Sequence, residues 1–281
     1  MKEQKILILG SNGQLGKQFQ TTLAAQKIEA LAPNEQDCDI TEFTKLNAYI
    51  LQSEPTIIVN CAAYNAVDEA EKDNTMAFQI NHLSVLNLAK ICSENNIRLV
   101  HYSSDYVFDG KKGALYTEED IPNPLNEYGK SKLAGENAVL ENAPNGLVLR
   151  LSWVFGDGKQ NFLYKLKNWA LNNSELKISA DETSVPTSTV DTVQATLTLL
   201  ENKETGLFHM TNSGYCSRYE WARFALEHLN MKNTIIPVSM SNFRSPADRP
   251  LFSAMSNEKI LERLDYDIPS WKDSTANYLK K

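Results

Sequence analysis

Three glycines near the start of the chain constrain its fold more than any other feature. Gly10, Gly13 and Gly16 follow the apolar run 6–9 and open the amphipathic segment 15–25, which predicts a buried strand, a tight turn and a helix. Glycines at this spacing let a backbone turn sharply, approach a pyrophosphate and pack helix against strand. The free N–H groups at the start of such a helix favour phosphate. We therefore expect a dinucleotide to be bound by residues of this turn, which are Gly10, Asn12, Gly13, Gln14, Leu15 and Gly16.

Short apolar runs alternate with longer amphipathic segments through the first half of the chain. The expected strands are 6–9, 28–32, 57–60, 98–103 and 146–152, and the expected helices are 15–25, 41–51, 75–95 and 128–142. Asp39 or Thr41 is the expected cap of the second helix. Solidly apolar strands are buried on both faces, and strands that alternate with helices form right-handed crossovers. The pattern predicts an α/β fold with a doubly wound parallel sheet of the Rossmann type.

The alternation loosens after about residue 152. Further helices are expected at 161–171, 190–200 and 218–229, strands at 176–179 and 206–210, and a loop at 241–252. We divide the chain into a dinucleotide-binding Rossmann domain, residues 1–155, and a smaller substrate-binding lobe, residues 156–281. Some elements of the lobe are expected to return to the first sheet.

Composition excludes several classes of protein. The formal net charge of −7 over 281 residues argues against nonspecific binding to nucleic acid, which requires a basic surface. No apolar stretch approaches the roughly 20 residues that span a bilayer. The four cysteines form no C-x-x-C pair, so we expect reduced thiols and a cytoplasmic protein. The sequence leaves a homodimer open.

A second motif carries the chemistry. Tyr128 and Lys132 are four residues apart, which places them on one face of the predicted helix. An ammonium beside a phenol is expected to lower the pKa of that phenol and to prepare it for proton transfer. Ser104 ends the predicted strand 98–103, where its hydroxyl can bond a substrate carbonyl. Small residues at the end of another strand suit close passage of a cofactor, so Ala62, Ala63 and Tyr64 join the expected cofactor site.

The choice between NADH and NADPH stays open. The end of the second strand, where an acidic residue would bind a ribose hydroxyl, holds Ala32, Pro33 and Asn34. Neither an aspartate for NAD nor an arginine for the extra phosphate of NADP stands there. Asp39 and Ile40, which follow closely, are the alternative contact for the adenine edge.

These motifs together resemble the extended short-chain dehydrogenase/reductase superfamily and, within it, the dTDP-4-dehydrorhamnose reductases. The resemblance spans residues 5 to about 260 and is carried by the glycine turn, N-C-A-A-Y, S-S-D-Y-V-F-D-G, Y-G-K-S-K and R-L-S-W-V-F-G. It implies a catalytic triad of Ser104, Tyr128 and Lys132, with Lys132 also reaching the nicotinamide ribose. The substrate contacts that it implies are Val67, Asp68, Ser104, Asp105, Tyr106, Trp153 and Arg249.

The implied reaction moves hydride from NADPH or NADH to C4 of dTDP-4-dehydro-6-deoxy-L-mannose, a keto-sugar carried on a nucleotide. Some relatives dimerise through a metal held by acidic residues near the first helix. Gln14 and Leu15 offer no carboxylate there, so we expect no metal. Arg218 has two interpretations, a phosphate contact or a surface salt bridge, and we favour the salt bridge. Asn81 either orders a water or makes a helix-packing hydrogen bond.

Alternative functions stay open as well. Another nucleotide-sugar reductase or an epimerase would share the motifs, and an epimerase would consume no cofactor. A non-catalytic NADP-binding regulatory subunit, resembling that of methionine adenosyltransferase, is less favoured because the serine, tyrosine and lysine are all present. A cofactor-sensing module without turnover is the last alternative.

Overall fold

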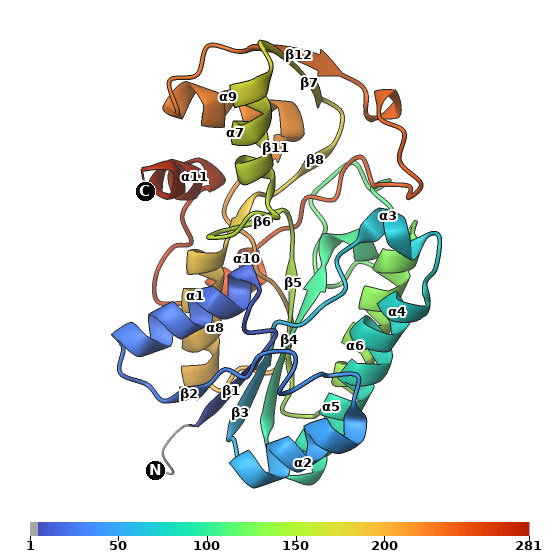
Figure 1. The fold of residues 1–281 in the computed structure, drawn as a ribbon, viewed down its shortest axis with the longest axis vertical. Coiled ribbons are helices and arrows are strands. Elements are labelled where there is room, and N and C mark those ends of the chain that lie inside the picture. Colours follow the sequence, from blue (N-terminus) through green and yellow to red (C-terminus); the bar gives the residue numbers. More distant parts are fainter. Residues whose placement is uncertain (1–4, 281) are drawn as a thin grey trace.

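The computed structural model describes residues 5–280, and a six-stranded parallel sheet forms its centre (Figure 1). Across the sheet the strands are β10 (Gly206–His209), β5 (Leu147–Leu151), β4 (Arg98–Ser104), β3 (Ile57–Asn60), β1 (Ile6–Leu9) and β2 (Ala30–Leu31). The order reverses between β1 and β3, because the chain first moves outward to β2 and then returns to the other side of β1. The expected doubly wound sheet is confirmed. β10 comes from the second half of the chain, yet it pairs with β5.

Helices cover both faces of this sheet. One face packs against α1 (Gln14–Ala25), α8 (Thr189–Glu201) and the short α10 (Glu258–Leu261). The other packs against α2 (Phe43–Ser53), α5 (Ser84–Glu94) and α6 (Glu127–Asn142). The strand residues of β1 and β3 are all buried, which explains why these strands are apolar up to Asn60 at the end of β3.

Two local predictions were wrong. The cap of α2 is Glu42, without a side-chain bond, while Asp39 accepts hydrogen bonds from the backbone and hydroxyl of Thr41 in the preceding turn. The expected long helix over residues 75–95 is α4 (Thr75–Phe78), a π-helical turn (Gln79–Leu83) and α5. The π turn presents Asn81 to its neighbours, and such turns occur frequently at functional sites.

The second lobe has its own apolar core. It contains α7 (Phe162–Asn172), α9 (Arg218–His228), α11 (Trp271–Leu279) and β7 (Glu175–Ser179), which pairs with β12 (Thr234–Val238). Short ladders join β6 (Val154–Phe155) to β9 (Thr187–Ser188) and β8 (Thr183–Ser184) to β11 (Cys216–Ser217). The sequence pattern did not predict these two-residue strands, α10 or α3 (Val67–Ala70), because so short a stretch has too few residues to show a period. It also missed the longer elements β12 and α11. The loop expected at 241–252 overlaps a single 3₁₀ turn (Met240–Asn242).

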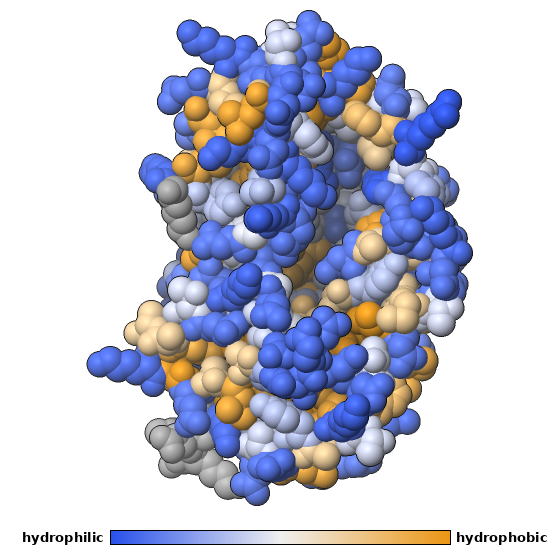
Figure 2. Space-filling model, in the orientation of Figure 1, coloured by the Kyte–Doolittle hydropathy of each residue, from blue (hydrophilic) through white to orange (hydrophobic). Residues whose placement is uncertain are grey.

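A hollow separates the lobe from the sheet on the face shown in Figure 2. All four cysteines are free thiols. Within residues 5–280, the structure contains no helix of the length and apolarity that crossing a membrane requires.

Candidate active site

A cavity of about 440 Å³ lies at the carboxyl ends of β1, β3, β4 and β5. This is the edge of the sheet where the strand order reverses, and open α/β sheets bind their ligands there. Both expected motifs contribute to its wall, the glycine turn through Gly13, Gln14 and Leu15, and the catalytic helix through Tyr128 and Lys132.

Gly10 and Gly16 lie behind the cavity and hold the turn in shape. Gly10 has a left-handed φ of +70°, and a Cβ there would lie 2.4 Å from the backbone nitrogen of Ala62 at the end of β3. A Cβ at Gly16 would lie 2.4 Å from the carbonyl oxygen of Gly10. Only glycine at both positions lets β1, α1 and the end of β3 approach this closely.

The start of α1 fits a bound phosphate. Its N-cap, Gly13, has no side chain with which to satisfy the first amides, and the N–H groups of Gln14 and Leu15 have no acceptor within residues 5–280. The side-chain oxygen of Gln14 and the hydroxyl of Ser103 are buried in the cavity wall without hydrogen-bond partners. Unpaired buried polar groups are rare in native proteins. The turn, the free amides and these atoms together fit a dinucleotide.

The start of α6 is fixed on both sides. Asn126 caps the helix by accepting from the N–H of Gly129, and its own amide donates to the carbonyl oxygen of Asp248, 122 residues away. A Cβ at Gly129 would lie 2.3 Å from the carbonyl oxygen of Tyr106. Gly129 thus lets the first turn of α6 press against the end of β4. The sequence alone does not reveal this role, although the glycine stands inside the tyrosine–lysine motif.

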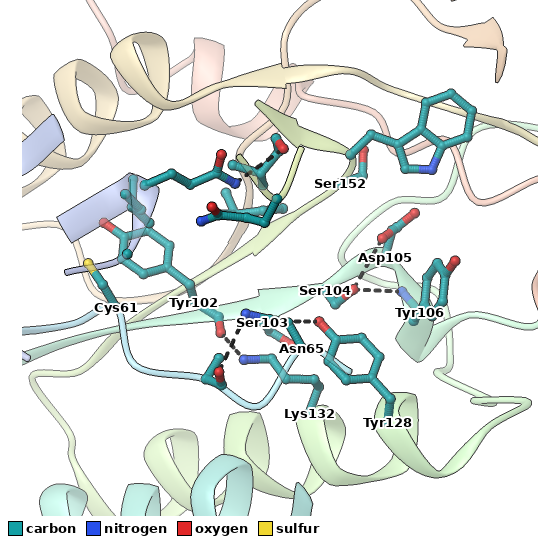
Figure 3. A pocket seen from close by; sticks show the side chains of 18 of the residues that line it. Cys61, Asn65, Tyr102, Ser103, Ser104, Asp105, Tyr106, Tyr128, Lys132 and Ser152 are labelled. Carbon is teal, nitrogen blue, oxygen red and sulfur yellow. Dashed lines mark hydrogen bonds between the residues drawn. The ribbon is translucent and has the colours of Figure 1, made fainter. Parts of the chain in front are cut away.

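Tyr128 and Lys132 both face the cavity (Figure 3). The Tyr128 hydroxyl donates to Asn65 Oδ1 at 3.3 Å, and Lys132 Nζ donates to the carbonyl oxygen of Tyr102 at 2.5 Å. Burial raises the pKa of Tyr128 to about 12, against a lowering by the Ser104 hydroxyl, and burial lowers the pKa of Lys132 to about 8. The expected lowering of the tyrosine pKa by the lysine was therefore wrong for this structure, because desolvation of the phenolate dominates.

Ser104 ends β4 next to these two residues. Its Oγ accepts from the N–H of Tyr106 and donates to Asp105 Oδ1, both at 3.1 Å. The ring of Tyr106 meets that of Tyr128 edge to face, with 5.8 Å between centroids. The strand end thus brings Ser104, Asp105 and Tyr106 into the wall of the cavity.

Asn81 supports the site from behind. Its side chain accepts from the N–H of Tyr64 and donates to the carbonyl oxygen of Tyr64 and to Ser131 Oγ, at 2.9–3.0 Å. A Cβ at Gly135 would lie 1.9 Å from the Asn81 carbonyl oxygen, so the π turn and α6 are in very close contact. These contacts match the packing interpretation of Asn81. They tie the loop after β3 to the catalytic helix.

On the lobe side of the cavity, Trp153 forms part of the wall. The backbone of Trp153 is left-handed, with φ of +39°, and the Arg218 guanidinium stacks on its ring at 3.4 Å from the centroid. Arg218 also pairs with Glu182 at 3.4 Å, and its side chain is only 18% exposed. The predicted salt bridge is present, but the expected surface position was wrong, because the aromatic stack buries the guanidinium.

Arg249 and Asp68 form an ion pair of 2.9 Å with each other, outside the cavity wall. Val67 next to Asp68 does line the cavity. Hydrogen bonds from Ser245 and Arg249 hold the pKa of Asp68 below its usual value, against the effect of partial burial, which raises it. The two charges expected to contact substrate are thus paired with each other. Their ion pair links α3, which contains Asp68, to the loop that contains Arg249 and runs on to Phe252, where the chain forms a β-bridge.

The cavity wall differs from the expected set in both directions. The expected residues that lie outside it are Gly10, Asn12, Gly16, Asp39, Ile40, Tyr64, Asp68 and Arg249. The wall residues that the motifs did not single out include Asn65, Ser103, Ser152, Gln160, Asn161 and Lys165. The last three precede or begin α7 and reach the site only because the lobe folds over the glycine turn, where Gln14 bonds the carbonyl oxygen of Val154. No motif in the sequence marks them.

The glycine turn also contacts the end of the second strand. Ser11 Oγ donates to the carbonyl oxygen of Pro33 at 2.6 Å. Ile40 is buried in the core between the sheet and α2, away from the cavity. The expectation that Ile40 passes under an adenine therefore has no support in the position of its side chain.

Comparison with known proteins agrees with this geometry. The family model described as RmlD substrate binding domain matches residues 4–281. A dTDP-4-dehydrorhamnose reductase from Burkholderia thailandensis is 36% identical over 286 residues, covering 95% of each chain. The crystal structure of a dTDP-4-dehydrorhamnose reductase from Clostridium acetobutylicum superposes with a TM-score of 0.95 at 37% identity, covering 98% of each chain. That of the Bacillus anthracis enzyme in complex with NADP gives 0.95 at 32% identity, covering 99% of each.

Fold and site together define a nicotinamide-dependent reductase of the extended short-chain dehydrogenase/reductase superfamily. Within it, the chain belongs to the dTDP-4-dehydrorhamnose reductase family. The family expected from the sequence motifs is confirmed.

Proposed function

We propose that this protein reduces the C4 keto group of dTDP-4-dehydro-6-deoxy-L-mannose to give dTDP-L-rhamnose, with NADPH or NADH as the reductant. One observation carries the proposal: Tyr128, Lys132 and Ser104 line the same cavity as Gly13, Gln14 and Leu15 at the start of α1, which is the proposed phosphate site. The names of the relatives supply the substrate. The three side chains and the dinucleotide turn supply what such a reduction requires.

Tyr128 is the proton donor in this proposal. Its pKa of about 12 keeps the phenol protonated at neutral pH, which is the form that can give a proton to a carbonyl oxygen. When bound, the reduced nicotinamide supplies the hydride that reaches the carbonyl carbon. Tyr128 supplies the proton to the oxygen, so that the carbonyl becomes an alcohol. Tyr128 is only 8% exposed, which keeps competing water from the phenol.

Lys132 and Ser104 hold the reacting groups in this scheme. The bond from Lys132 Nζ to the Tyr102 carbonyl orients the ammonium within the cavity. Below its pKa of about 8 the ammonium is charged and favours the phenolate that Tyr128 becomes. Ser104 places its hydroxyl beside the phenol and lowers the phenol's pKa, in opposition to burial.

The lobe is proposed to hold the nucleotide portion of the substrate. Trp153 offers an aromatic face, and Lys165 is the cation that lines the cavity on this side. Trp153 and Arg218 stack on each other, so each side chain restrains the orientation of the other at this wall of the cavity. The question of a homodimer stays open, and the cytoplasmic location stays a prediction.

The test is the loss of reduced-nicotinamide absorbance with dTDP-4-dehydro-6-deoxy-L-mannose, with NADPH and NADH assayed in parallel. We expect oxidation in proportion to sugar reduced, and the two rates identify the preferred cofactor. Net consumption also separates a reductase from an epimerase. Absence of oxidation with either cofactor, while the protein binds the dinucleotide, would overturn the proposal.

A further inference from the structure

One buried carboxylate beside the proposed catalytic serine accepts hydrogen bonds from three separate parts of the chain. Asp105 Oδ1 accepts from Ser104 at 3.1 Å, and Oδ2 accepts from Ser184 at 2.9 Å and from Ser253 at 2.5 Å. Ser104 ends β4, Ser184 lies in β8 of the lobe, and Ser253 follows 148 residues after Asp105 in sequence. The Asp105 side chain is thus engaged by protein groups, although the family resemblance had placed it among the substrate contacts.

This carboxylate is costly to keep ionised. Asp105 is 2% exposed and forms no ion pair within residues 5–280. Burial raises its pKa to about 6 against the three serine hydroxyls, which lower it, and the charge of Glu182 raises it further. The cations nearest in this network are already paired, Arg218 with Glu182 and Arg249 with Asp68. A costly ionised group next to a reactive centre is typical of function and not of stability alone.

We propose that Asp105 is a positioning residue that orients the Ser104 hydroxyl and couples it to the substrate-binding lobe through Ser184 and Ser253. The inference rests on the proposed reductase function. Ser104 Oγ accepts from the N–H of Tyr106 and donates its single hydrogen to Asp105, so these two bonds together fix the direction of the one lone pair left on Oγ. Oδ2 of this carboxylate accepts from Ser184 and Ser253, and Oδ1 accepts from Ser104. The position of the lobe and the orientation of the Ser104 hydroxyl are therefore coupled through the Asp105 side chain.

The ionised form is the one that can hold all three hydroxyls. A protonated carboxyl turns one oxygen into a donor and loses acceptor capacity, so the three serines can no longer all donate to it. The other ionisable groups that face Asp105 are Glu182, Tyr106 and Tyr128. Both tyrosines have raised pKa values and stay neutral at this pH. The buried histidines do not titrate near pH 6, because burial lowers the pKa of His209 to about 3 and that of His101 well below its usual value.

The first test is Asp105→Asn, measured by kcat and by thermal unfolding at pH 7.5. An amide oxygen cannot accept from all three serines, so we expect kcat to fall by about tenfold to a hundredfold, as misorientation of a reacting group does. We expect the Tm to hold or rise, because the variant removes an ionised group from a buried position. A fall in Tm that accompanies the loss of kcat would assign Asp105 a structural role and overturn the inference. A kcat within twofold of the unmodified protein would overturn it as well.

The second test compares the pH profiles of kcat in the unmodified protein, in Asp105→Asn, and in two serine variants that leave Ser104 and Asp105 in place. In the unmodified protein, kcat should fall as the pH decreases through about 6, which gives the pH profile an acid limb. Asp105→Asn should lack this acid limb. Ser253→Ala removes a hydrogen bond that lowers the Asp105 pKa, so its acid limb should move to higher pH. Ser274→Ala is the matched control, because it removes a serine–aspartate bond to Asp191 elsewhere in the lobe and should leave the limb unmoved. Identical limbs in all four proteins would overturn the inference.

These tests separate the inference from the proposed function. If the unmodified protein oxidises neither cofactor with the keto-sugar, the function fails and the inference falls with it. If the unmodified protein turns over and Asp105→Asn matches it, only the inference fails.

Discussion

The two walls of the cavity are built in different ways. On one side, the glycine turn and the first turn of α6 each place their functional groups within a few neighbouring residues. On the other side, Trp153, Arg218 and Glu182 meet although they are tens of residues apart in the chain. The first wall is the side proposed to bind the cofactor and do the chemistry, and the second is proposed to recognise the substrate. Changes to the first should therefore affect turnover and cofactor binding, and changes to the second should affect KM.

The largest expected effect is that of Tyr128→Phe, which removes the proposed proton donor and keeps the ring. We expect kcat to fall by about a thousandfold, within the usual range of general acid catalysis. Dinucleotide binding, followed by fluorescence of the reduced nicotinamide, should be unchanged. Tyr164→Phe on the exposed face of α7 is the control and should keep full activity. Turnover that survives in Tyr128→Phe would assign the proton to another group.

Gly10→Ala should distort the glycine turn in the first wall and leave the reactive side chains of that wall unchanged. The new Cβ would lie 2.4 Å from the Ala62 nitrogen, in backbone of φ +70°, so we expect a loss of about 2–4 kcal/mol in the free energy of unfolding. Dinucleotide affinity should fall with it. Gly113→Ala is the matched control, since Gly113 has the same φ of +70° and nothing within 4 Å of the added carbon. It should cost about 1 kcal/mol. Equal losses in the two variants would contradict the close approach of the turn to β3.

The pH dependence of turnover should report on Lys132. Burial lowers its pKa to about 8, so the ammonium that favours the phenolate is present below this pH and is lost as the pH rises above it. We expect kcat/KM to fall on the alkaline side by about tenfold per pH unit. Lys132→Arg keeps its charge at every pH measured and should remove this limb, at a lower overall rate. A flat profile from pH 7 to 10 in the unmodified protein would contradict the assignment.

The smallest effect belongs to the second wall. Trp153→Ala removes the aromatic surface on this side of the cavity and its stack with Arg218. We expect the substrate KM to rise by about fivefold, equivalent to about 1 kcal/mol of lost aromatic contact with the substrate. The kcat and the cofactor affinity should hardly change. Trp169→Ala, on the exposed side of α7, is the control. A fall in kcat without a rise in KM would contradict the assignment of substrate recognition to the second wall.

The order of the main strands and helices was largely readable from the sequence, because a parallel sheet buries its strands completely and leaves solid apolar runs. Ile57–Asn60 was predicted to the residue, and α6 within one residue. The errors fall where tertiary contacts override local pattern. The helix around Asn81 contains a π turn, and the Asn81 side chain in it bonds both the loop after β3 and α6, which no periodicity reveals.

By itself, the sequence determined the parallel sheet, the dinucleotide turn and the pair of Tyr128 and Lys132, because each depends on spacing within one strand, turn or helix. The tertiary structure alone decided the ionisation and the neighbours of these groups. Burial raised the pKa of Tyr128 and lowered that of Lys132, and folding brought Ser184 and Ser253 onto Asp105 from distant segments. Desolvation and long-range hydrogen bonds depend on what surrounds a side chain in space, which the spacing of residues along the chain does not specify.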